Sequence, residues 1–283
     1  MKLYADSGST KTEWILTEKD KIINQFTTIG MNPLFIKENE IYSELDKNFV
    51  NHYFKDVKEL HFFGAGCSDI KQANKLSSIL GKLFNNAQIT IKTDIELAVL
   101  AVSTKKEKSI VSILGTGSTF RIFDGNKTIK NYSSLGFIIG DEGSGTHIGK
   151  SLLRKIFYNQ INTEIYFYFF DDYDLQVETL IENVYSKPFP NKYLASFTHF
   201  CKKYIDSESI EEIVIDSFYS YFKNHILNVE DYQEHTLHFV GSVAFHFKEQ
   251  LEEVAAEFDC EIGTIIQKPL ALYLANLKNN YLP

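Results

Sequence analysis

A carboxylate stands directly before a turn of small and hydroxyl residues near the start of the sequence. In YADSGSTKTEWIL, residues 4–16, Asp6 precedes Ser7-Gly8-Ser9-Thr10, and an alternating apolar stretch follows. Turns rich in Gly, Ser and Thr expose backbone N–H groups that bind anions, phosphate in particular. A carboxylate is suited to such a place when a divalent cation lies between it and the phosphate, since one carboxylate and phosphate oxygens commonly hold Mg²⁺. The stretch therefore predicts phosphate binding, with Asp6 as a magnesium ligand.

The same arrangement occurs a second time. In VSILGTGSTFRIFDG, residues 111–125, Thr116-Gly117-Ser118-Thr119 lies between two apolar runs. Each copy predicts a strand, a tight turn and a second strand, with glycine allowing the backbone to approach a ligand closely. The first copy alone would fit a plain surface hairpin. The repetition favours two facing phosphate-binding loops.

The elements around these loops predict an α/β protein. Each copy runs on into a polar turn that continues an antiparallel meander, and strands and helices alternate after the first copy. The expected helices are near 37–50, 70–84 and 246–258, within 145–228, and from Pro269 onward, and the expected strands include 59–66, 87–94 and 236–244.

Two domains fit the length and the charge pattern of the chain. At 283 residues the chain can bury two cores. The polar, lysine-rich segment STKKEKS, residues 103–109, comes directly before the second copy and is the candidate hinge. We expect one domain at 1–108, completed by the C-terminal helix 268–283, and a second at 109–267.

Composition and charge exclude several functions. A net charge of −8 argues against binding to a nucleic-acid backbone. The longest apolar run, IYFYFF at 165–170, is too short to span a bilayer, and no apolar signal core opens the sequence, so we expect a cytoplasmic protein. Cys67, Cys201 and Cys260 fit neither a disulfide framework nor a zinc site. The segment GSGTHIGKS resembles a P-loop, but its glycine spacing is wrong.

Four motifs, in this order, resemble those of N-acetylglucosamine kinases and the wider BadF/BadG/BcrA/BcrD ATPase family. ADSGSTKTEW, LGTGSTFRIF, GFIIGDEGSGTHIG and FVGSVA are similar to the phosphate-1, phosphate-2, sugar and adenosine motifs. The resemblance implies two ribonuclease H-like, actin-like ATPase domains, with ATP, Mg²⁺ and a sugar in the cleft between them. It also implies a kinase of an amino sugar, first of all N-acetylglucosamine at its 6-hydroxyl, and a homodimer.

The resemblance also assigns site residues. The catalytic aspartate of the family opens a helix after a strand, as Asp94 does in IKTDIELAV, and a carboxylate that takes the hydroxyl proton fits phosphoryl transfer. As a residue alone, Asp94 fits a helix N-cap or a first-turn acid. Asp141 would bind sugar hydroxyls, Glu142 would serve structure or metal, and both also fit a charged surface turn. The other implied contacts are Gly8, Ser9, Thr10, Lys11, Thr12, Gly115, Thr116, Gly117 and Ser118 for phosphate, Gly241 and Ser242 for adenosine, and Asn32, Thr116, Gly136 and Glu142 for the sugar.

Departures from the family pattern leave the acceptor open. Leu135 stands where the family often has Trp, and Thr146 and His147 replace an aromatic residue after GDEGSG. Ser242 replaces a glycine of the adenosine motif, and Asn32 precedes a proline, which alone predicts a turn. N-acetylglucosamine, N-acetylmuramic acid, glucosamine and glucose all remain candidates.

Two other functions stay as alternatives. The family also contains ATPases that activate 2-hydroxyacyl-CoA dehydratases and hold an iron–sulfur cluster with cysteines. The three cysteines offer no matching pair near the GDEGS segment. A sugar sensor without turnover would lack the catalytic base, and Asp94 is present.

Overall fold

The chain folds into two compact units. The computed structural model describes residues 1–19, 21–48, 55–105, 107–132, 134–279 and 281. Unit 1 holds Met1–Val102 and Pro269–Pro283, and unit 2 holds Ser103–Lys268. The change of unit therefore comes at 102/103, at the start of the lysine-rich segment and before the predicted boundary at 108/109. Lys106 of that segment and residues 49–50 of the first predicted helix lie outside the described residues.

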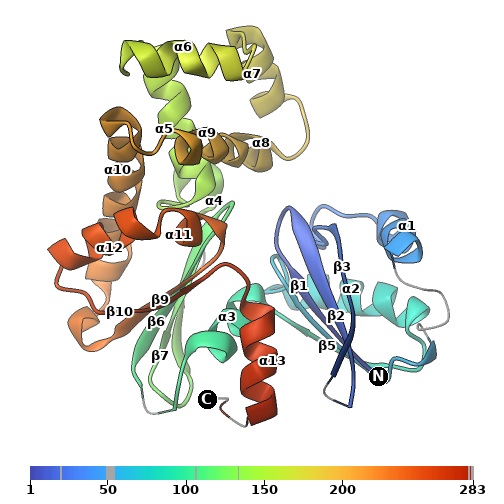
Figure 1. Cartoon of the computed structure of the whole chain (residues 1–283). Coiled ribbons are helices and arrows are strands. Elements are labelled where there is room, and N and C mark those ends of the chain that lie inside the picture. The colour runs from blue at the N-terminus through green and yellow to red at the C-terminus, as the bar shows by residue number, and fades with distance from the viewer. Residues whose placement is uncertain (20, 49–54, 106, 133, 280, 282–283) are drawn as a thin grey trace. The chain divides into compact units, whose positions relative to one another are not determined.

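Unit 1 is a five-stranded mixed sheet with helices (Figure 1). The strand order is β3-β2-β1-β4-β5. The first three strands form an antiparallel meander, and β4 and β5 add in parallel beside β1. Its elements are β1 (Lys2–Ser7), β2 (Lys11–Glu18), β3 (Lys21–Ile29), α1 (Glu38–Asn48), β4 (Glu59–Gly64), α2 (Ile70–Leu83), β5 (Gln88–Lys92), α3 (Asp94–Val102) and α13 (Pro269–Asn279).

Unit 2 repeats this sheet topology. Its strand order is β10-β9-β6-β7-β8, with β6, β7 and β8 as the antiparallel meander and β9 and β10 in parallel beside β6. Read from the meander edge, the two orders are the same, so the internal repeat predicted from the two hairpins is confirmed. The strands are β6 (Ser109–Leu114), β7 (Ser118–Phe123), β8 (Thr128–Tyr132), β9 (Thr236–Val240) and β10 (Ile262–Ile266).

Nine of the described α-helices belong to unit 2, and the six that lie within 145–228 confirm the predicted helical region there. In Figure 1, α6 and α7 lie at the top of unit 2, far from its sheet. The predicted strand at 236–244 is wrong at its end, because residues from Ser242 onward form a helix. The helices are α4 (Gly136–Ile139), α5 (Gly145–Phe157), α6 (Thr163–Asp172), α7 (Val177–Tyr185), α8 (Pro190–Ser196), α9 (Thr198–Lys203), α10 (Glu208–Asn224), α11 (Ser242–His246) and α12 (Lys248–Glu257).

Gly149, in the segment that resembles a P-loop, serves helix packing. Gly149 lies in α5 where that helix meets α8. A Cβ atom at this position would come within 1.9 Å of the carbonyl oxygen of Leu194. Only glycine allows so close an approach, which accounts for Gly149 without a phosphate-binding role.

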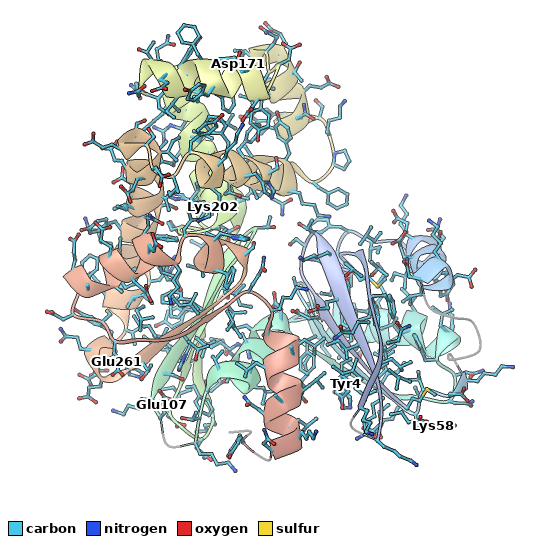
Figure 2. The ribbon with its side chains drawn as sticks, in the orientation of Figure 1. Tyr4, Lys58, Glu107, Asp171, Lys202 and Glu261 are labelled. Carbon is cyan, nitrogen blue, oxygen red and sulfur yellow. The ribbon has the colours of Figure 1, made fainter. Side chains whose placement is uncertain are left out.

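The C-terminal helix packs within unit 1. Tyr4, labelled in Figure 2, is buried on β1, and its ring stacks on His61 at 5.1 Å and meets the edge of Tyr273 of α13 at 6.3 Å. The side-chain amide of Asn276 donates to the carbonyl oxygen of Ala101 at 2.8 Å. Helix α13 therefore covers β1 and α3, although more than 160 residues separate it from them in the sequence.

The helices and the cysteines bear on the membrane, disulfide and zinc functions that the sequence argued against. No helix in the described ranges combines the length and the apolar character that crossing a membrane requires. Cys67, Cys201 and Cys260 are all free thiols, and the first two are buried.

Candidate active site

The first hairpin turns at Gly8, Ser9 and Thr10. The N–H of Gly8 donates to the carbonyl oxygen of Lys11 at 3.0 Å, which closes the turn. The carbonyl oxygen of Thr10 accepts from the N–H of Gly30 at 3.0 Å, which joins the turn to the end of β3. Thr10 and Lys11 are exposed. The turn is thus a fixed loop with polar groups at its surface.

Buried hydroxyls hold this hairpin in shape. The hydroxyl oxygens of Ser7 and Thr12 lie 2.8 Å apart, and Thr12 Oγ1 donates to the carbonyl oxygen of Ile29 at 2.9 Å. Ser7 Oγ accepts from the N–H of Met31 at 2.9 Å. The Thr12 side chain, predicted to contact phosphate, is therefore buried and engaged within the hairpin.

Carboxylates gather around Asp6 at the end of β1. The pKa of Asp6 is raised to about 7, mainly by burial. The negative charges of Asp94 and Glu13 add to this shift, and the positive charge of Lys11 opposes it. Negative charge therefore outweighs the single positive charge of Lys11 around Asp6, which favours binding of a cation. No group of three His, Cys, Asp or Glu suited to a metal occurs among the described residues. Asp6 fits Mg²⁺ as a single protein carboxylate that shares the ion with phosphate oxygens.

Asp94 opens α3, as the sequence predicted, but another residue caps the helix. The N–H of Thr93 donates to Glu96 Oε2 at 2.9 Å, and the N–H of Glu96 donates to Thr93 Oγ1 at 3.3 Å. These reciprocal bonds form a capping box with Thr93 as the N-cap. Asp94 is a half-buried first-turn acid instead. The pattern T-x-x-E in IKTDIELAV carried this signal, and the sequence analysis missed it.

The second hairpin is bound to the start of α5. The N–H of Gly115 donates to the carbonyl oxygen of Gly117 at 3.0 Å, which closes the turn. The first two amides of α5 then donate to the turn, Gly145 to the carbonyl oxygen of Gly115 at 2.8 Å and Thr146 to that of Thr116 at 3.2 Å. The turn between β6 and β7 is therefore fixed by a helix N-terminus.

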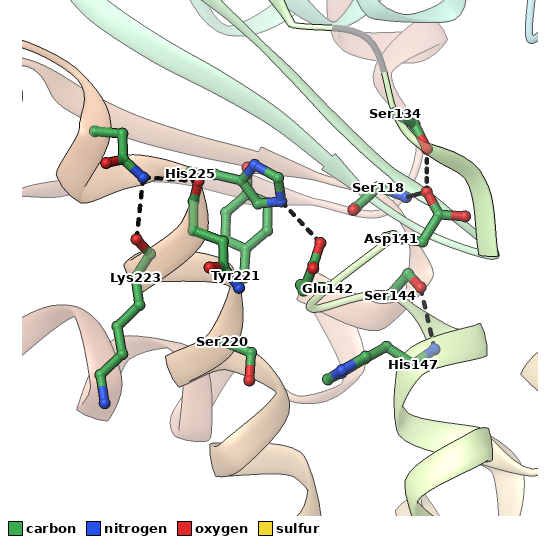
Figure 3. Close-up of polar contacts among 12 residues, drawn as sticks. Ser118, Ser134, Asp141, Glu142, Ser144, His147, Ser220, Tyr221, Lys223 and His225 are labelled. Atoms are coloured by element: carbon green, nitrogen blue, oxygen red, sulfur yellow. Dashed lines mark hydrogen bonds and ion pairs between the residues drawn. The ribbon is translucent and has the colours of Figure 1, made fainter. Parts of the chain in front are cut away.

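Asp141 is held against this hairpin with one carboxylate oxygen occupied. Its backbone has a φ of 58°, and its Oδ1 accepts from the N–H of Ser118 at 3.2 Å and from the hydroxyl of Ser134 (Figure 3). A Cβ atom at Gly117 would lie 2.8 Å from Asp141 Oδ2, so a side chain there would displace the Asp141 carboxylate. Within the described part of the chain, Oδ2 accepts no hydrogen bond. Asp141 is therefore a fixed acceptor with one oxygen available to a ligand hydroxyl.

Glu142 points the other way and pairs with a histidine. Its Oε2 lies 3.1 Å from Nε2 of His225 (Figure 3). The ring of His225 lies against Phe120 at 5.6 Å and Tyr221 at 5.1 Å between centroids. Tyr221 is buried and donates its phenol proton to Ser112 Oγ at 2.7 Å. Glu142 thus joins the loop before α5 to the end of α10.

Asp141, Glu142 and His225 line one cavity in unit 2 with a volume of about 290 Å³. The sequence analysis missed the part of its wall that comes from α10 and the residue after it, since that region read only as helix. The spacing of apolar residues in a helix does not indicate which of its polar residues will contact a distant loop, as His225 contacts Glu142. The lining residues are Ser118, Thr119, Phe120, Tyr132, Ser134, Leu135, Gly140, Asp141, Glu142, Tyr221, Asn224 and His225.

The remaining predicted contacts lie at element ends. Asn32 forms the turn that Asn-Pro predicts, because its Oδ1 accepts from the N–H of Leu34 at 3.0 Å. Gly136 opens α4 with a φ of 78°. Gly241 lies between β9 and α11 with a φ of 117°, and the exposed Ser242 begins α11. The structure thus brings together Asp6 with Asp94 in unit 1, and Ser118, Asp141 and Glu142 in unit 2.

Comparison with known proteins identifies the family. No protein-family model and no curated protein sequence matches the chain. Among solved structures, that of the "Putative N-acetylglucosamine Kinase" from Porphyromonas gingivalis matches over 100% of both chains, with 32% sequence identity and a TM-score of 0.91. The chain belongs to the family of that protein.

More distant structures of the family's fold are also similar. A "Putative N-acetylglucosamine Kinase" from Chromobacterium violaceum matches over 98% of both chains with 14% identity and a TM-score of 0.68. A ROK family glucokinase from Streptomyces griseus, in complex with glucose and AMPPNP, matches over 98% of both chains with 12% identity and a TM-score of 0.64. At these identities the likeness concerns the fold. The predicted two-domain, actin-like ATPase fold is confirmed.

Proposed function

We propose that this protein is an ATP-dependent kinase that phosphorylates an amino sugar, with N-acetylglucosamine as the acceptor and its 6-hydroxyl as the phosphorylated group. Support comes from the full-length likeness to the Porphyromonas gingivalis protein named for that activity. The observation that carries the proposal is the carboxylate of Asp141, fixed by Ser118 and Ser134 with one oxygen left to accept from a hydroxyl.

Unit 2 would supply phosphate and sugar contacts from neighbouring groups. The turn of Gly115, Thr116 and Gly117 offers backbone groups for phosphate, as turns of this kind do. The next residue, Ser118, uses its N–H to hold Asp141. Phosphate binding and sugar binding are therefore assigned to adjacent residues of one rigid hairpin.

Unit 1 would supply the base and the metal ligand. Asp94 is the proposed base that takes the proton of the sugar hydroxyl. Thr93 and Glu96, not Asp94, form the capping box of α3, and Asp94 Oδ1 accepts from the N–H of Ile95 at 2.9 Å. Asp6 would hold Mg²⁺, and the turn of Gly8, Ser9 and Thr10 would bind phosphate. When bound, Mg²⁺ neutralises the charge on the phosphate oxygens.

The adenosine and acceptor contacts complete the assignment. Gly241 and Ser242, at the junction of β9 and α11, would lie beside adenosine. Asn32 would help to bind the acceptor through its side-chain amide nitrogen, since its Oδ1 already accepts from Leu34. Gly136 opens α4, next to the cavity that contains Asp141.

A sugar-dependent ADP-release assay tests the proposal. Purified protein with Mg²⁺ and ATP is assayed with N-acetylglucosamine, N-acetylmuramic acid, glucosamine and glucose, and the phosphorylated position is determined by NMR. We expect ADP release that depends on an amino sugar and a 6-phosphate product. ATP hydrolysis of the same rate with and without every sugar would contradict the proposal and favour a partner-activating ATPase.

A further inference from the structure

Lys150 lies in the segment that resembles a P-loop, and the proposed kinase function gives it no role. It belongs to α5, and its Nζ donates to the carbonyl oxygen of Phe137 in α4. The side chain is half-buried. Lys150 therefore ties α4, which precedes the acidic loop of Asp141 and Glu142, to the helix that follows this loop.

The ammonium group of Lys150 has a cost that a neutral side chain would avoid. Burial lowers the pKa of Lys150, while the charges of Asp141 and Glu142 raise it. A neutral donor, such as an amide, could also bond the Phe137 carbonyl oxygen, and its burial would cost less than that of a charge. The charge of Lys150 is therefore better explained by the two carboxylates than by Phe137.

Neighbouring histidines supply less positive charge to these carboxylates. His147 on α5 has a pKa that burial lowers, and its Nδ1 lies 2.7 Å from the hydroxyl oxygen of Ser217. Its ring is therefore mostly neutral at neutral pH. His225 can bond Glu142 in its neutral form, because one ring nitrogen of neutral imidazole donates. Lys150 therefore supplies a permanent positive charge that acts on both carboxylates.

The charge of Lys150 reaches the cavity of unit 2 through these carboxylates. Asp141 and Glu142 line the cavity, and Lys150 is not among the lining residues in the described part of the chain. A ligand in the cavity thus meets two negative groups that one lysine partly balances. Charges act on one another over several ångströms in such a site. Without the lysine, the cavity would favour a positively charged ligand and disfavour a negatively charged one.

We propose that Lys150 is a positioning residue that sets the charge selectivity of the acceptor site. By balancing Asp141 and Glu142, it lowers the preference of the site for a cationic sugar, such as glucosamine, relative to a neutral one, such as N-acetylglucosamine. This assignment rests on the proposed kinase function, with Asp141 as the residue that binds sugar hydroxyls. Lys150 touches neither the sugar nor ATP and acts through the two carboxylates.

Lys150→Met tests this proposal, since methionine keeps most of the length of lysine and removes its charge. The kcat/KM values for glucosamine, N-acetylglucosamine and N-acetylmuramic acid are measured at about pH 7, at which an amine like that of glucosamine carries a proton. For each sugar, the value of the variant is divided by that of the wild type. We expect this factor to be highest for the cationic glucosamine and lowest for the anionic N-acetylmuramic acid, with about three- to tenfold between successive sugars. Added salt should narrow these differences, because it screens charge.

Two further variants separate charge from packing. Lys150→Arg keeps the charge and a donor for Phe137, so it should keep the selectivity of the wild type. Glu142→Gln removes a negative charge without a change at Lys150, and it should reverse the order of the three sugars. The matched control is Arg154→Met, which removes a charge from the exposed last turn of the same helix and should leave the three factors equal. Melting curves show whether each variant is folded.

The outcomes distinguish this proposal from the kinase function. A folded Lys150→Met variant that changes kcat/KM by the same factor for all three sugars overturns the charge role and leaves the kinase function standing. If that variant does not fold, equal factors for the three sugars in Glu142→Gln overturn the charge role instead.

Wild-type protein that phosphorylates no sugar contradicts the kinase function itself. Calorimetric binding constants of wild type and Lys150→Met for the same three sugars then test Lys150, and their ratios should follow the same order of charge. Wild-type protein that binds none of the three sugars overturns both proposals.

Discussion

The N–H of Ser118 and the carboxylate of Asp141 are joined by a 3.2 Å hydrogen bond. Ser118 begins β7, directly after the second glycine turn, and Asp141 precedes the N-cap of α5. The helix in turn donates its first amides to the same turn. The hairpin, the acidic loop and the helix therefore form one rigid arrangement, which is what a site for positioned hydroxyl and phosphate groups needs.

Asp141→Asn should lower kcat/KM for the sugar. The carboxamide oxygen can still accept from Ser118 and Ser134, but a nitrogen that donates replaces Oδ2. Loss of a charged acceptor costs about 1.5–3 kcal/mol, or roughly 10- to 150-fold. Steady-state kinetics with the preferred sugar measure this, with Asp216→Asn on the exposed side of α10 as the control. Equal kinetics for the two variants would remove Asp141 from sugar binding.

Substitutions at Asp94 and Thr93 should separate catalysis from capping. Asp94→Asn cannot accept a proton, so we expect turnover to fall by about 10²- to 10⁴-fold with a melting temperature close to that of the wild type. Thr93→Ala breaks the capping box, which costs roughly 1 kcal/mol of stability. This variant should melt at a lower temperature and keep most of its turnover. The assignment of Asp94 as base fails if turnover by Asp94→Asn is undiminished.

Asp6→Asn should weaken the dependence of the reaction on Mg²⁺ without destabilising the protein. Burial and the charges of Asp94 and Glu13 disfavour the ionised form of Asp6. A neutral asparagine at this position therefore relieves repulsion. We expect at least a roughly tenfold loss of turnover and a melting temperature no lower than that of the wild type. Activity is titrated with MgCl₂, and Glu18→Gln at the exposed end of β2 is the control. An unchanged magnesium titration for Asp6→Asn would contradict the metal assignment.

His238 should make the free energy of unfolding depend on pH. Burial lowers its pKa below 6.5, against the opposing charges of Glu107 and Glu261. Its Nδ1 accepts from the N–H of Thr264 at 2.9 Å, and Glu107 Oε1 lies 3.8 Å from Nε2. Because the unfolded chain takes up the proton more readily, stability is fully present above pH 6.5 and falls as the pH drops below it.

Urea unfolding between pH 8 and 5 measures this contribution. One proton changes the free energy of unfolding by at most about 1.4 kcal/mol per pH unit. His147 has a pKa that burial also lowers. The raised pKa of Asp6, about 7, stabilises the folded state as the pH falls, so the wild-type slope contains all three groups and only the difference between variants isolates His238. His238→Gln should flatten the slope partly, and the same change at the exposed His199 should not alter it. A slope below pH 6.5 that is the same for the wild type and His238→Gln would contradict the contribution of His238.

The repeat and the start of α3 were readable from the sequence because they follow local rules. The two glycine turns between apolar runs predicted two hairpins, and each hairpin begins a sheet of the same strand order. Asp94 was placed at a helix start from the residues around it. Strand β10 was missed since it is short, contains Gly263 and has a register shift between Ile262 and Ile265.

The cavity wall was not readable, because it depends on contacts between distant segments. Tyr221 and His225 reach the site only through the packing of α10 against α5 and the sheet. Nothing in the period of apolar residues within α10 distinguishes His225 from any other polar residue. The partner of Glu142 could be found only once the fold was known.

The packing of α13 on α3 and β1 has a consequence for protein synthesis. Unit 2 is one continuous segment, and all of it leaves the ribosome before the residues of α13 do. The faces of α3 and β1 that Tyr273 and Asn276 cover are therefore without their partner while the nascent chain still grows. Domains generally fold as units during translation. Unit 2 therefore completes its fold before unit 1, although synthesis of unit 1 begins first.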